Sequence, residues 1–359
     1  MQVLTPILSH AVRNSVRSGL PFALVRKSPG APLQWFCAEH TGRSAGTSLP
    51  LFHIAPWGMQ RRTVVIPALM SPQEAAGYNG PTQALPEPWG ISTPREEYVA
   101  GLTSLIDDLR DTGGKTVISR TICGTADDLD IVAMADDCFA ANPDACCCLL
   151  STPQTGCWLI ATPETLLATD AQAGTLRTMA LAGTRKAGSH GPWDQKNRDE
   201  QNMVTDFILD HLQHLGYTPV ASEPHTRHAG AVEHICTDIT ATMTTPEKAL
   251  DTALSLSPTP AVCGTPRELS LTRIAATESH PRRLYGGFFA IEESDSSLHS
   301  FVTLRCAQLS QSGWCIYAGG GITPASDPVS EWEETANKAS RMLNLVLRHS
   351  TITKQESVF

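Results

Sequence analysis

The chain has 359 residues, 41% of them hydrophobic and 18% charged, with a formal net charge of −9 at pH 7. That length gives enough apolar material for one large domain or two ordinary ones, and so acidic a chain has no bulk attraction to nucleic acid or anionic lipid. It shows no basic segment followed by an apolar run at its start, and no apolar stretch of about 18 residues. We therefore expect a cytoplasmic protein that binds neither nucleic acid nor membrane.

Eleven cysteines are present, three of them consecutive at Cys146–Cys148. Neighbouring residues of a strand point to opposite faces, so these three cannot share one face. No CxxC pair and no Cys/His spacing typical of zinc sites occurs. The cysteines are therefore predicted to be reduced, mostly buried thiols of a cytosolic protein.

The first 86 residues predict one helix and several strands. The helix runs from Pro6 to Ser18, and short apolar runs favouring strands follow at Phe22–Val25, Leu33–Cys37 and Val64–Leu69. Gly80-Pro81 and Pro86-Glu87-Pro88 then predict a loop. This loop joins an N-terminal sheet portion to the remainder of the chain.

A helix and a strand are predicted next. Thr93 is the expected N-cap, with Pro94 at the first helical position and Glu96 at the third. Apolar residues recur at helical spacing from Val99 to Leu109, and Gly113-Gly114 ends the pattern. Lys115–Ile122 then predicts a strand, which places Lys115 at its first position.

The rest of the chain contains more strands than helices. Helices are predicted from Glu200 to Leu215 and from a capping box that begins at Ser330. Strand-like runs are Trp158–Ala161, Tyr285–Ile291, Phe301–Cys306, which would place Thr303 and Arg305 on one face, and Cys315–Ala318. The order does not alternate as βαβ units, which favours a mixed α+β architecture with large sheets.

Three glutamates are candidates for chemistry. Glu200 and Glu334 lie near predicted helix starts, and Glu164 follows Pro163 at the end of a strand. Taken singly, each is typical of a solvated carboxylate favoured by a helix dipole. Glu334 and Lys338 are likewise spaced as an ordinary i,i+4 ion pair.

Several motifs occurring together in order change that interpretation. They are Leu181–Arg185, Lys196–Glu200, Ser257–Pro266, Glu278 with Leu284–Gly287, Leu304–Cys306, Ala318–Ile322, Ser326–Pro328, and Glu331 with Glu334, Thr335 and Lys338. The set resembles the chorismate-utilising enzymes, which include the isochorismate, salicylate, anthranilate and aminodeoxychorismate synthases. The likeness extends from about Pro94 to Leu347, whereas residues 1–86 are more divergent.

The resemblance implies an α+β fold in which two large mixed or antiparallel β-sheets, packed with surrounding helices, enclose a buried site. It implies a single chorismate-binding domain over residues 1–359, whose family-like catalytic part is 94–347. It also implies Mg²⁺ held by Glu200 and Glu334, because magnesium prefers oxygen ligands and keeps several waters. Glu331, one turn away, is a candidate ligand through water or a solvated residue of the helix.

The resemblance also implies the groups that hold the dianionic substrate, chorismate. Arg305 and Lys338 match carboxylate-binding positions, and Thr184 and His234 match positions beside the ring. The glycines fit close approach of backbone to the ligand. Each of these residues also has a purely structural interpretation. Arg305 could be a charge on an edge strand, Thr184 a turn residue and His234 a buried core histidine. The three glycines, Gly319, Gly320 and Gly321, could form a turn from a strand into a loop.

Lys115 indicates the branch of the family. It takes the place where isochorismate and salicylate synthases carry a lysine, and amine-adding members commonly carry glutamine. The resemblance makes Lys115 the general base that activates water for attack at C2, although a lysine at a strand start is usually a solvated charge.

Glu164 matches the general acid for the departing C4 hydroxyl, so its pKa should be raised by an apolar pocket. Ala182 stands where aminodeoxychorismate synthases often carry a nucleophilic lysine.

The sequence therefore predicts a Mg²⁺-dependent isochorismate synthase, an isomerase of menaquinone or siderophore biosynthesis, acting as a monomer. A salicylate synthase would use the same Lys115 and then eliminate pyruvate, and a non-catalytic chorismate-binding relative is the alternative of another class. The chain departs from the isochorismate synthase pattern at Ser257, which replaces a usual histidine, and at Gly320 and Cys263. The Cys146–Cys148 run and the short stretch between Ala182 and Glu200 also differ.

Overall fold

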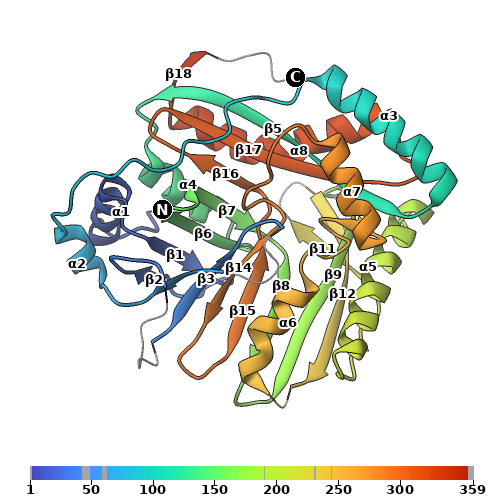
Figure 1. The fold of residues 1–359 in the computed structure, drawn as a ribbon, viewed down its shortest axis with the longest axis horizontal. Helices are drawn as coiled ribbons and strands as arrows, with labels where there is room; N and C mark the ends of the chain where they lie inside the picture. Colours follow the sequence, from blue (N-terminus) through green and yellow to red (C-terminus); the bar gives the residue numbers. More distant parts are fainter. Residues whose placement is uncertain are drawn as a thin grey trace.

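The computed structural model describes residues 2–42, 49–58, 63–189, 191–229, 232–243 and 245–354. Two nine-stranded sheets and the helices around them make up this part of the chain (Figure 1). The helices are α1 (Pro6–Ser18), α2 (Pro72–Gly77), α3 (Arg95–Thr112), α4 (Ile131–Ala141), α5 (Gln195–His214), α6 (Ala249–Leu256), α7 (Arg267–Thr277) and α8 (Pro328–Arg348), with the 3₁₀ turn η1 (Pro246–Lys248).

We call the two sheets A and B, and their named strands pair antiparallel throughout. In spatial order sheet A holds β13 (Gly264–Thr265), β5 (Lys115–Asp127), β17 (Gly313–Ile322), β16 (Cys306–Leu309), β7 (Gly156–Thr162), β6 (Cys146–Thr152), β1 (Phe22–Arg26) and β2 (Gln34–Cys37), with β18 (Thr351–Lys354) beside β5. Sheet B holds β10 (Val220–Ala221), β12 (Val232–Thr242), β9 (Thr175–Lys186), β8 (Thr165–Asp170), β15 (Leu298–Val302), β14 (Phe288–Glu292), β3 (Leu51–Ala55) and β4 (Val64–Pro67), with β11 (His225–Ala229) beside β12.

The sheets pack face to face, and helices cover their outer faces. The inter-sheet core contains Phe52 and Phe289 from sheet B and Trp158 and Tyr317 from sheet A. Apolar side chains of α1, α4 and α8 cover the outer face of sheet A, and those of α5 and α6 cover sheet B. These layers confirm the predicted α+β fold of two large sheets with surrounding helices.

The three consecutive cysteines lie on the central strand β6. Cys146 and Cys148 belong to the inter-sheet core, whereas Cys147 faces the helices on the other side of sheet A. This alternation is the one that strand geometry predicts. All eleven cysteines are buried and free, which confirms the prediction that they are mostly buried.

Several predicted element boundaries were wrong. Pro94, not Thr93, is the N-cap of α3, and the Thr93 hydroxyl instead accepts a bond from the Thr121 amide at 3.0 Å. Helix α5 begins at Gln195, so Glu200 lies in its second turn, and α8 begins at Pro328, so Ser330 lies inside it. In both helices an aspartate caps first, because Asp194 and Asp327 accept amide bonds at 2.8 Å.

Two predicted strands also differ from the structure. The run Phe301–Cys306 is not one strand, because the chain leaves sheet B after Val302 and enters sheet A at Cys306. Arg305 therefore lies in the crossover between the sheets, with a φ of 49°. The run from Tyr285 contributes a strand only from Phe288 onward, so Tyr285 lies in the turn before β14.

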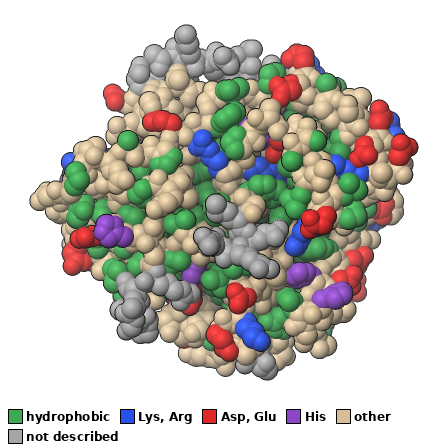
Figure 2. Space-filling model, viewed as in Figure 1, with side chains coloured by type: hydrophobic (Ala, Val, Ile, Leu, Met, Phe, Trp, Pro, Cys, Tyr) green, Lys and Arg blue, Asp and Glu red, His purple; other side chains and the backbone are tan. Residues whose placement is uncertain are grey.

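No helix in the described ranges is both long and apolar enough to cross a membrane. On the face drawn in Figure 2, coloured Lys and Arg side chains are interspersed with Asp and Glu rather than gathered in one basic patch. Charges of both signs are therefore mixed on this face.

Candidate active site

A cavity lies where the two sheets meet at one end of the inter-sheet core. Helix α5 contributes Glu200, helix α8 contributes Lys338, and the β7–β8 turn contributes Glu164. The remaining polar and glycine lining comes from β9, β12, the sheet crossover and β17, as Thr184, His234, Arg305 and Gly319 to Gly321. Most of the predicted site residues therefore line one cavity. The other three, Lys115, Glu331 and Glu334, contact groups at its wall.

The three glycines form part of strand β17 and not a strand-to-loop turn, which corrects the alternative considered for them. Their lack of side chains permits close approach. A Cβ added at Gly321 would lie 2.6 Å from Lys115 Cε and 2.7 Å from Glu200 Oε1. A Cβ added at Gly319 would lie 2.6 Å from the Tyr285 hydroxyl. A Cβ at Gly320 would lie 2.9 Å from Glu331 Oε2. Side chains from three elements thus approach this strand at distances that exclude a methyl group.

Each of three carboxylates near these glycines is paired with a lysine. Lys115 Nζ lies 2.7 Å from Glu200 Oε1, across the junction of β5 and α5. Lys338 Nζ lies 2.6 Å from Glu334 Oε1 within α8. The third pair joins Lys196 Nζ to Glu331 Oε1 at 2.9 Å.

The donor set around the glycine strand fits magnesium. A Cβ at Gly321 would meet Glu200 Oε1, and one at Gly320 would lie 3.8 Å from Glu334 Oε1, so both predicted ligands border adjacent residues of one strand. Hard carboxylate oxygens of this kind are the ligands that Mg²⁺ prefers. Glu331 Oε2 also borders this strand, 2.9 Å from a Cβ at Gly320, and Glu331 Oε1 is held by Lys196 and by the Ser326 hydroxyl, which donates to it at 2.8 Å.

Glu164 is the carboxyl with the most unusual proton affinity in the cavity. Glu164 is 4% exposed, and its side-chain carboxyl has no hydrogen-bond or ion-pair partner within the described part of the chain. Burial raises its pKa to about 8, although the positive charges of Lys115 and Arg227 oppose the shift. At neutral pH the carboxyl is therefore mostly protonated and can donate a proton into the cavity.

Two cations are available for an anionic ligand. Lys338 Nζ donates a hydrogen bond to the Gly319 carbonyl at 3.0 Å in addition to its pair with Glu334. Arg305 makes no ion pair with any residue that the structure describes. The Arg305 carbonyl accepts a bond from the Ala161 amide at 3.2 Å, which fixes its backbone at the crossover. Its guanidinium thus remains free to bind a carboxylate in a bidentate manner.

His234 and Thr184 form a polar wall on sheet B. His234 Nδ1 lies 2.9 Å from the Gly183 carbonyl and 3.3 Å from Thr184 Oγ1. Burial and the nearby Arg305 lower the His234 pKa to about 4, so the ring is neutral at pH 7. Gly183 has a φ of +67° where the β9–β12 register skips one residue, which turns Thr184 toward the cavity. Both residues therefore line the cavity, as predicted.

The sequence-based prediction missed several residues of the site. Tyr285 lines the cavity and stacks on Tyr317 with ring centroids 5.8 Å apart. Gln201 is buried beside Glu200 and accepts a bond from the Ala182 amide at 2.9 Å, which fastens α5 to β9. Tyr285 lies within the motif Leu284–Gly287, and Lys196 and Gln201 lie close to Glu200 in the sequence. Their nearness to predicted site residues along the chain was the signal that could have identified them.

A second cavity adjoins the first one. The two share Pro163, Arg305 and Lys338 as lining residues. Arg341 of α8 lines the second cavity, and its guanidinium donates to the Asn142 side chain at 2.8 Å. The free cation at Arg305 is therefore reached from both cavities.

Comparisons with known proteins show the family and the fold of the chain. A family model described as chorismate binding enzyme matches residues 60–344. The isochorismate synthase EntC of Escherichia coli (strain K12) is 34% identical over 166 residues, which are 46% of this chain and 42% of that protein. The isochorismate synthase MenF of the same strain is 34% identical over 186 residues, 48% of this chain and 42% of that protein.

The matched segment thus spans less than half the length of either relative. The fold likeness extends further: the solved structure of MenF, the menaquinone-specific isochorismate synthase from Escherichia coli, superposes with a TM-score of 0.77. That superposition covers 96% of this chain and 92% of the other at 20% sequence identity, which shows a shared fold.

Proposed function

The chain belongs to the chorismate-binding enzyme family, and from this premise we propose that it is a magnesium-dependent isochorismate synthase. The observation that carries the proposal is the meeting of a lysine amine and a protonated carboxyl at one cavity. Lys115 Nζ is held on Glu200, a lining residue, and Glu164, whose pKa is raised to about 8, lines the same cavity. Addition of water at one carbon and loss of hydroxyl at another need this pairing of base and acid.

The proposed reaction balances with these two groups. Lys115 acts as the general base and accepts a proton from the water whose oxygen bonds to C2 of chorismate. The ring double bond shifts, the C4–O bond breaks, and Glu164 donates its proton to the departing hydroxyl, which leaves as water. One water enters and one leaves, so chorismate and isochorismate are isomers. Solvent then returns the proton from Lys115 to Glu164.

The remaining residues bind and orient the ring. Arg305 and Lys338 supply positive charge for the two substrate carboxylates, and the neutral His234 and Thr184 offer hydrogen bonds. Glu200 and Glu334 would hold Mg²⁺, which when bound neutralises and anchors a substrate carboxylate. Fixing the substrate between base and acid contributes to the rate through orientation.

Product identification tests the proposal. The purified chain is incubated with chorismate and Mg²⁺, and the products are separated by chromatography. We expect isochorismate to accumulate. Abundant salicylate would identify a salicylate synthase, which would use the same base and then eliminate pyruvate. Binding of chorismate without any turnover would identify a non-catalytic relative.

The metal ligands are tested by a matched pair of variants on α8. Glu334 is half-buried at the cavity wall, whereas the neighbouring Glu333 is exposed. We expect Glu334→Gln to abolish the rise of activity on Mg²⁺ titration, because a carboxamide is a poor magnesium ligand. Glu333→Gln should titrate as the unaltered chain does. An unchanged Mg²⁺ titration in Glu334→Gln would remove this residue from the metal site.

We further propose that the enzyme acts as a cytoplasmic monomer. The eleven cysteines are buried free thiols, as is usual in reducing compartments. The product would serve menaquinone or catecholate siderophore biosynthesis, in which isochorismate is consumed.

A further inference from the structure

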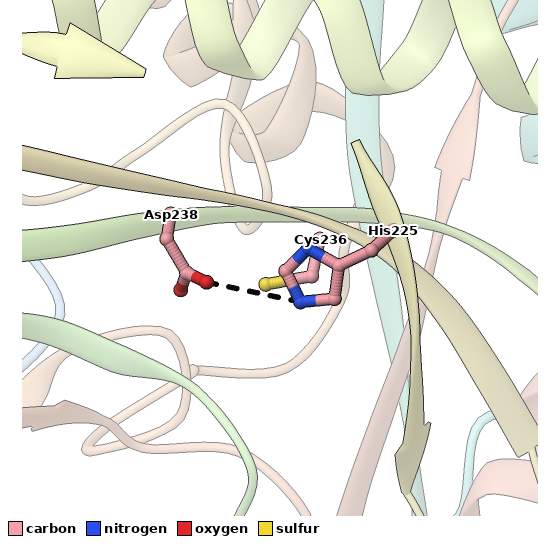
Figure 3. A group of neighbouring side chains, drawn as sticks. All are labelled: His225, Cys236 and Asp238. Carbon is pink, nitrogen blue, oxygen red and sulfur yellow. Dashed lines mark ion pairs between the residues drawn. The ribbon is translucent and has the colours of Figure 1, made fainter. Parts of the chain in front are cut away.

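A second group of potential metal ligands lies on strands β11 and β12 of sheet B. The ligand atoms of His225, Cys236 and Asp238 all lie within 4.8 Å of one another. His225 Nε2 and Asp238 Oδ2 are 3.8 Å apart, and Figure 3 shows the Cys236 thiol close to this pair. These residues are separate from the carboxylates around Gly320 and Gly321.

The strand register brings the three side chains together. His225 of β11 is directly opposite Cys236 of β12, so their side chains share a face of the sheet. Asp238 is two residues beyond Cys236 and therefore points to the same face. Thr237, between them, points the other way and bonds to Gln201 of α5. The group consequently lies on the face of β12 that α5 does not cover.

We propose that His225, Cys236 and Asp238 bind a divalent ion of the zinc class. Imidazole nitrogen, thiolate sulfur and carboxylate oxygen are the three donor types that Zn²⁺ accepts. Zinc–ligand bonds of about 2.0–2.3 Å place ligand atoms about 3.3–3.8 Å apart in a tetrahedral site. The His225–Asp238 separation of 3.8 Å is at the upper end of this range, and the other ligand-atom separations, which are at most 4.8 Å, would shorten on binding. Three protein ligands leave the fourth position open to water or another ligand.

The burial of the three residues suits capture of an ion from solvent. Cys236 is fully buried beside Met179 and Leu181, whereas the side chains of His225 and Asp238 are 47% and 56% exposed. The thiol is a fixed anchor, and the two exposed ligands can reach a hydrated ion.

The donor set also separates this site from the proposed magnesium site. Mg²⁺ prefers an all-oxygen set and dehydrates reluctantly, whereas a thiolate and an imidazole favour zinc. The two sites would therefore select different ions from a mixture.

The proposed site adjoins the cavity. His234, which lines the cavity, is two residues before Cys236 on β12, and Arg227 of β11 is directly opposite His234. The charge of Arg227 acts on both Glu164 and Cys236. An ion bound by Cys236 would thus lie on the same row of side chains as the cavity wall.

Cobalt titration provides a direct test that does not depend on catalytic activity. Co²⁺ is added to the reduced full chain in excess Mg²⁺, and the visible and near-ultraviolet absorption is recorded. We expect a thiolate-to-cobalt charge-transfer band that saturates at one equivalent and is abolished by Zn²⁺. Cys236→Ser should lose the band, and His225→Gln and Asp238→Asn should weaken cobalt binding.

The matched control is His228→Gln. His228 is an exposed histidine on β11 but points to the opposite face from His225, so its loss should leave the band unchanged. Circular dichroism of each variant confirms that it is folded. Absence of a charge-transfer band at one equivalent, or its persistence in folded Cys236→Ser, would overturn the proposal. Either result leaves the isochorismate synthase assignment untouched, because that assignment rests on product identification with Mg²⁺.

Discussion

Glu164, Glu331 and Glu334 are the same residue type, but their surroundings give them different proton affinities. Glu164 is buried without a partner, and burial raises its pKa to about 8. Burial and the charge of Glu334 also raise the pKa of Glu331, even though Lys196 pairs with it. For Glu334 burial is outweighed by the attraction of Lys338, and its pKa falls below the usual value. Environment thus makes one carboxyl a proton donor and leaves another ionised for a cation.

The raised pKa of Glu164 predicts an alkaline limit to activity. The general acid must carry its proton, so activity should be present below pH 8 and fall as the pH rises through the pKa of about 8. We expect the pH profile of kcat/KM to show this descending limb. Glu164→Gln should lower kcat by about 10²- to 10⁴-fold and remove the limb, because the amide has no proton to donate. A limb that persists unchanged in the residual activity of the variant would belong to another group.

Lys115 supports a second prediction at this scale. Lys115→Met keeps the aliphatic stem in its buried position but removes Nζ and its 2.7 Å contact with Glu200. Hydration should fall by about 10²- to 10⁴-fold, as for loss of a general base, while chorismate still binds. Rapid-quench turnover and equilibrium binding would measure the two effects separately. Lys186→Met, an exposed lysine at the end of β9, is the control for loss of charge. Normal turnover in Lys115→Met would exclude Lys115 as the base.

At the scale of elements, the sequence predicted which elements exist better than where they end. The helix Pro6–Ser18 and the start of β5 at Lys115 are confirmed. The starts of α5 and α8 were missed because each helix is capped by an earlier aspartate, Asp194 or Asp327. Local composition does not rank such competing caps. The crossover at Arg305 was missed because strand pairing is non-local. An apolar run does not reveal a change of sheet.

The glycines of strand β17 support a prediction about the close approach of side chains to this strand. Gly321→Ala would place a Cβ 2.6 Å from Lys115 Cε and 2.7 Å from Glu200 Oε1, so the Lys115–Glu200 pair must shift. Because displacement of a catalytic group by about 1 Å can cost about 100-fold in rate, we expect a loss of that order in kcat. The variant should nevertheless remain folded by circular dichroism. Gly77→Ala, where a Cβ meets nothing within 4 Å, is the control and should retain full activity. A fully active Gly321→Ala would show that the pair can move without consequence.

At the scale of the molecule, the fold class was predictable, but the pairing of distant elements was not. Many short strands without βαβ alternation indicate a mixed α+β architecture with large sheets, and the resemblance to a known family implied that there are two of them. The contact of Lys115 with Glu200 and that of Lys196 with Glu331 join elements far apart in the chain, and no spacing rule reports them. The site residues were predicted because an ordered set of motifs resembles a known family. Gln201 lies outside these motifs, and Tyr285 lies inside one of them but was given no role.

The position of the cavity between the sheets predicts that ligand binding stabilises the whole molecule. Chorismate would contact Arg305 at the crossover, Lys338 on α8 and His234 on sheet B, groups that unfolding separates. A ligand that binds only the native state at 100 times its Kd adds about 2.7 kcal/mol to the free energy of unfolding.

The unfolding temperature of Lys115→Met, which should bind chorismate without consuming it, is measured by calorimetry in Mg²⁺ with and without chorismate. Adding Arg305→Gln should remove most of the shift but leave the unliganded unfolding temperature nearly unchanged, because Arg305 has no ion-pair partner within the described ranges. Arg177→Gln, an exposed arginine on β9, should retain the full shift. Equal shifts in both double variants would place the substrate carboxylate away from the crossover.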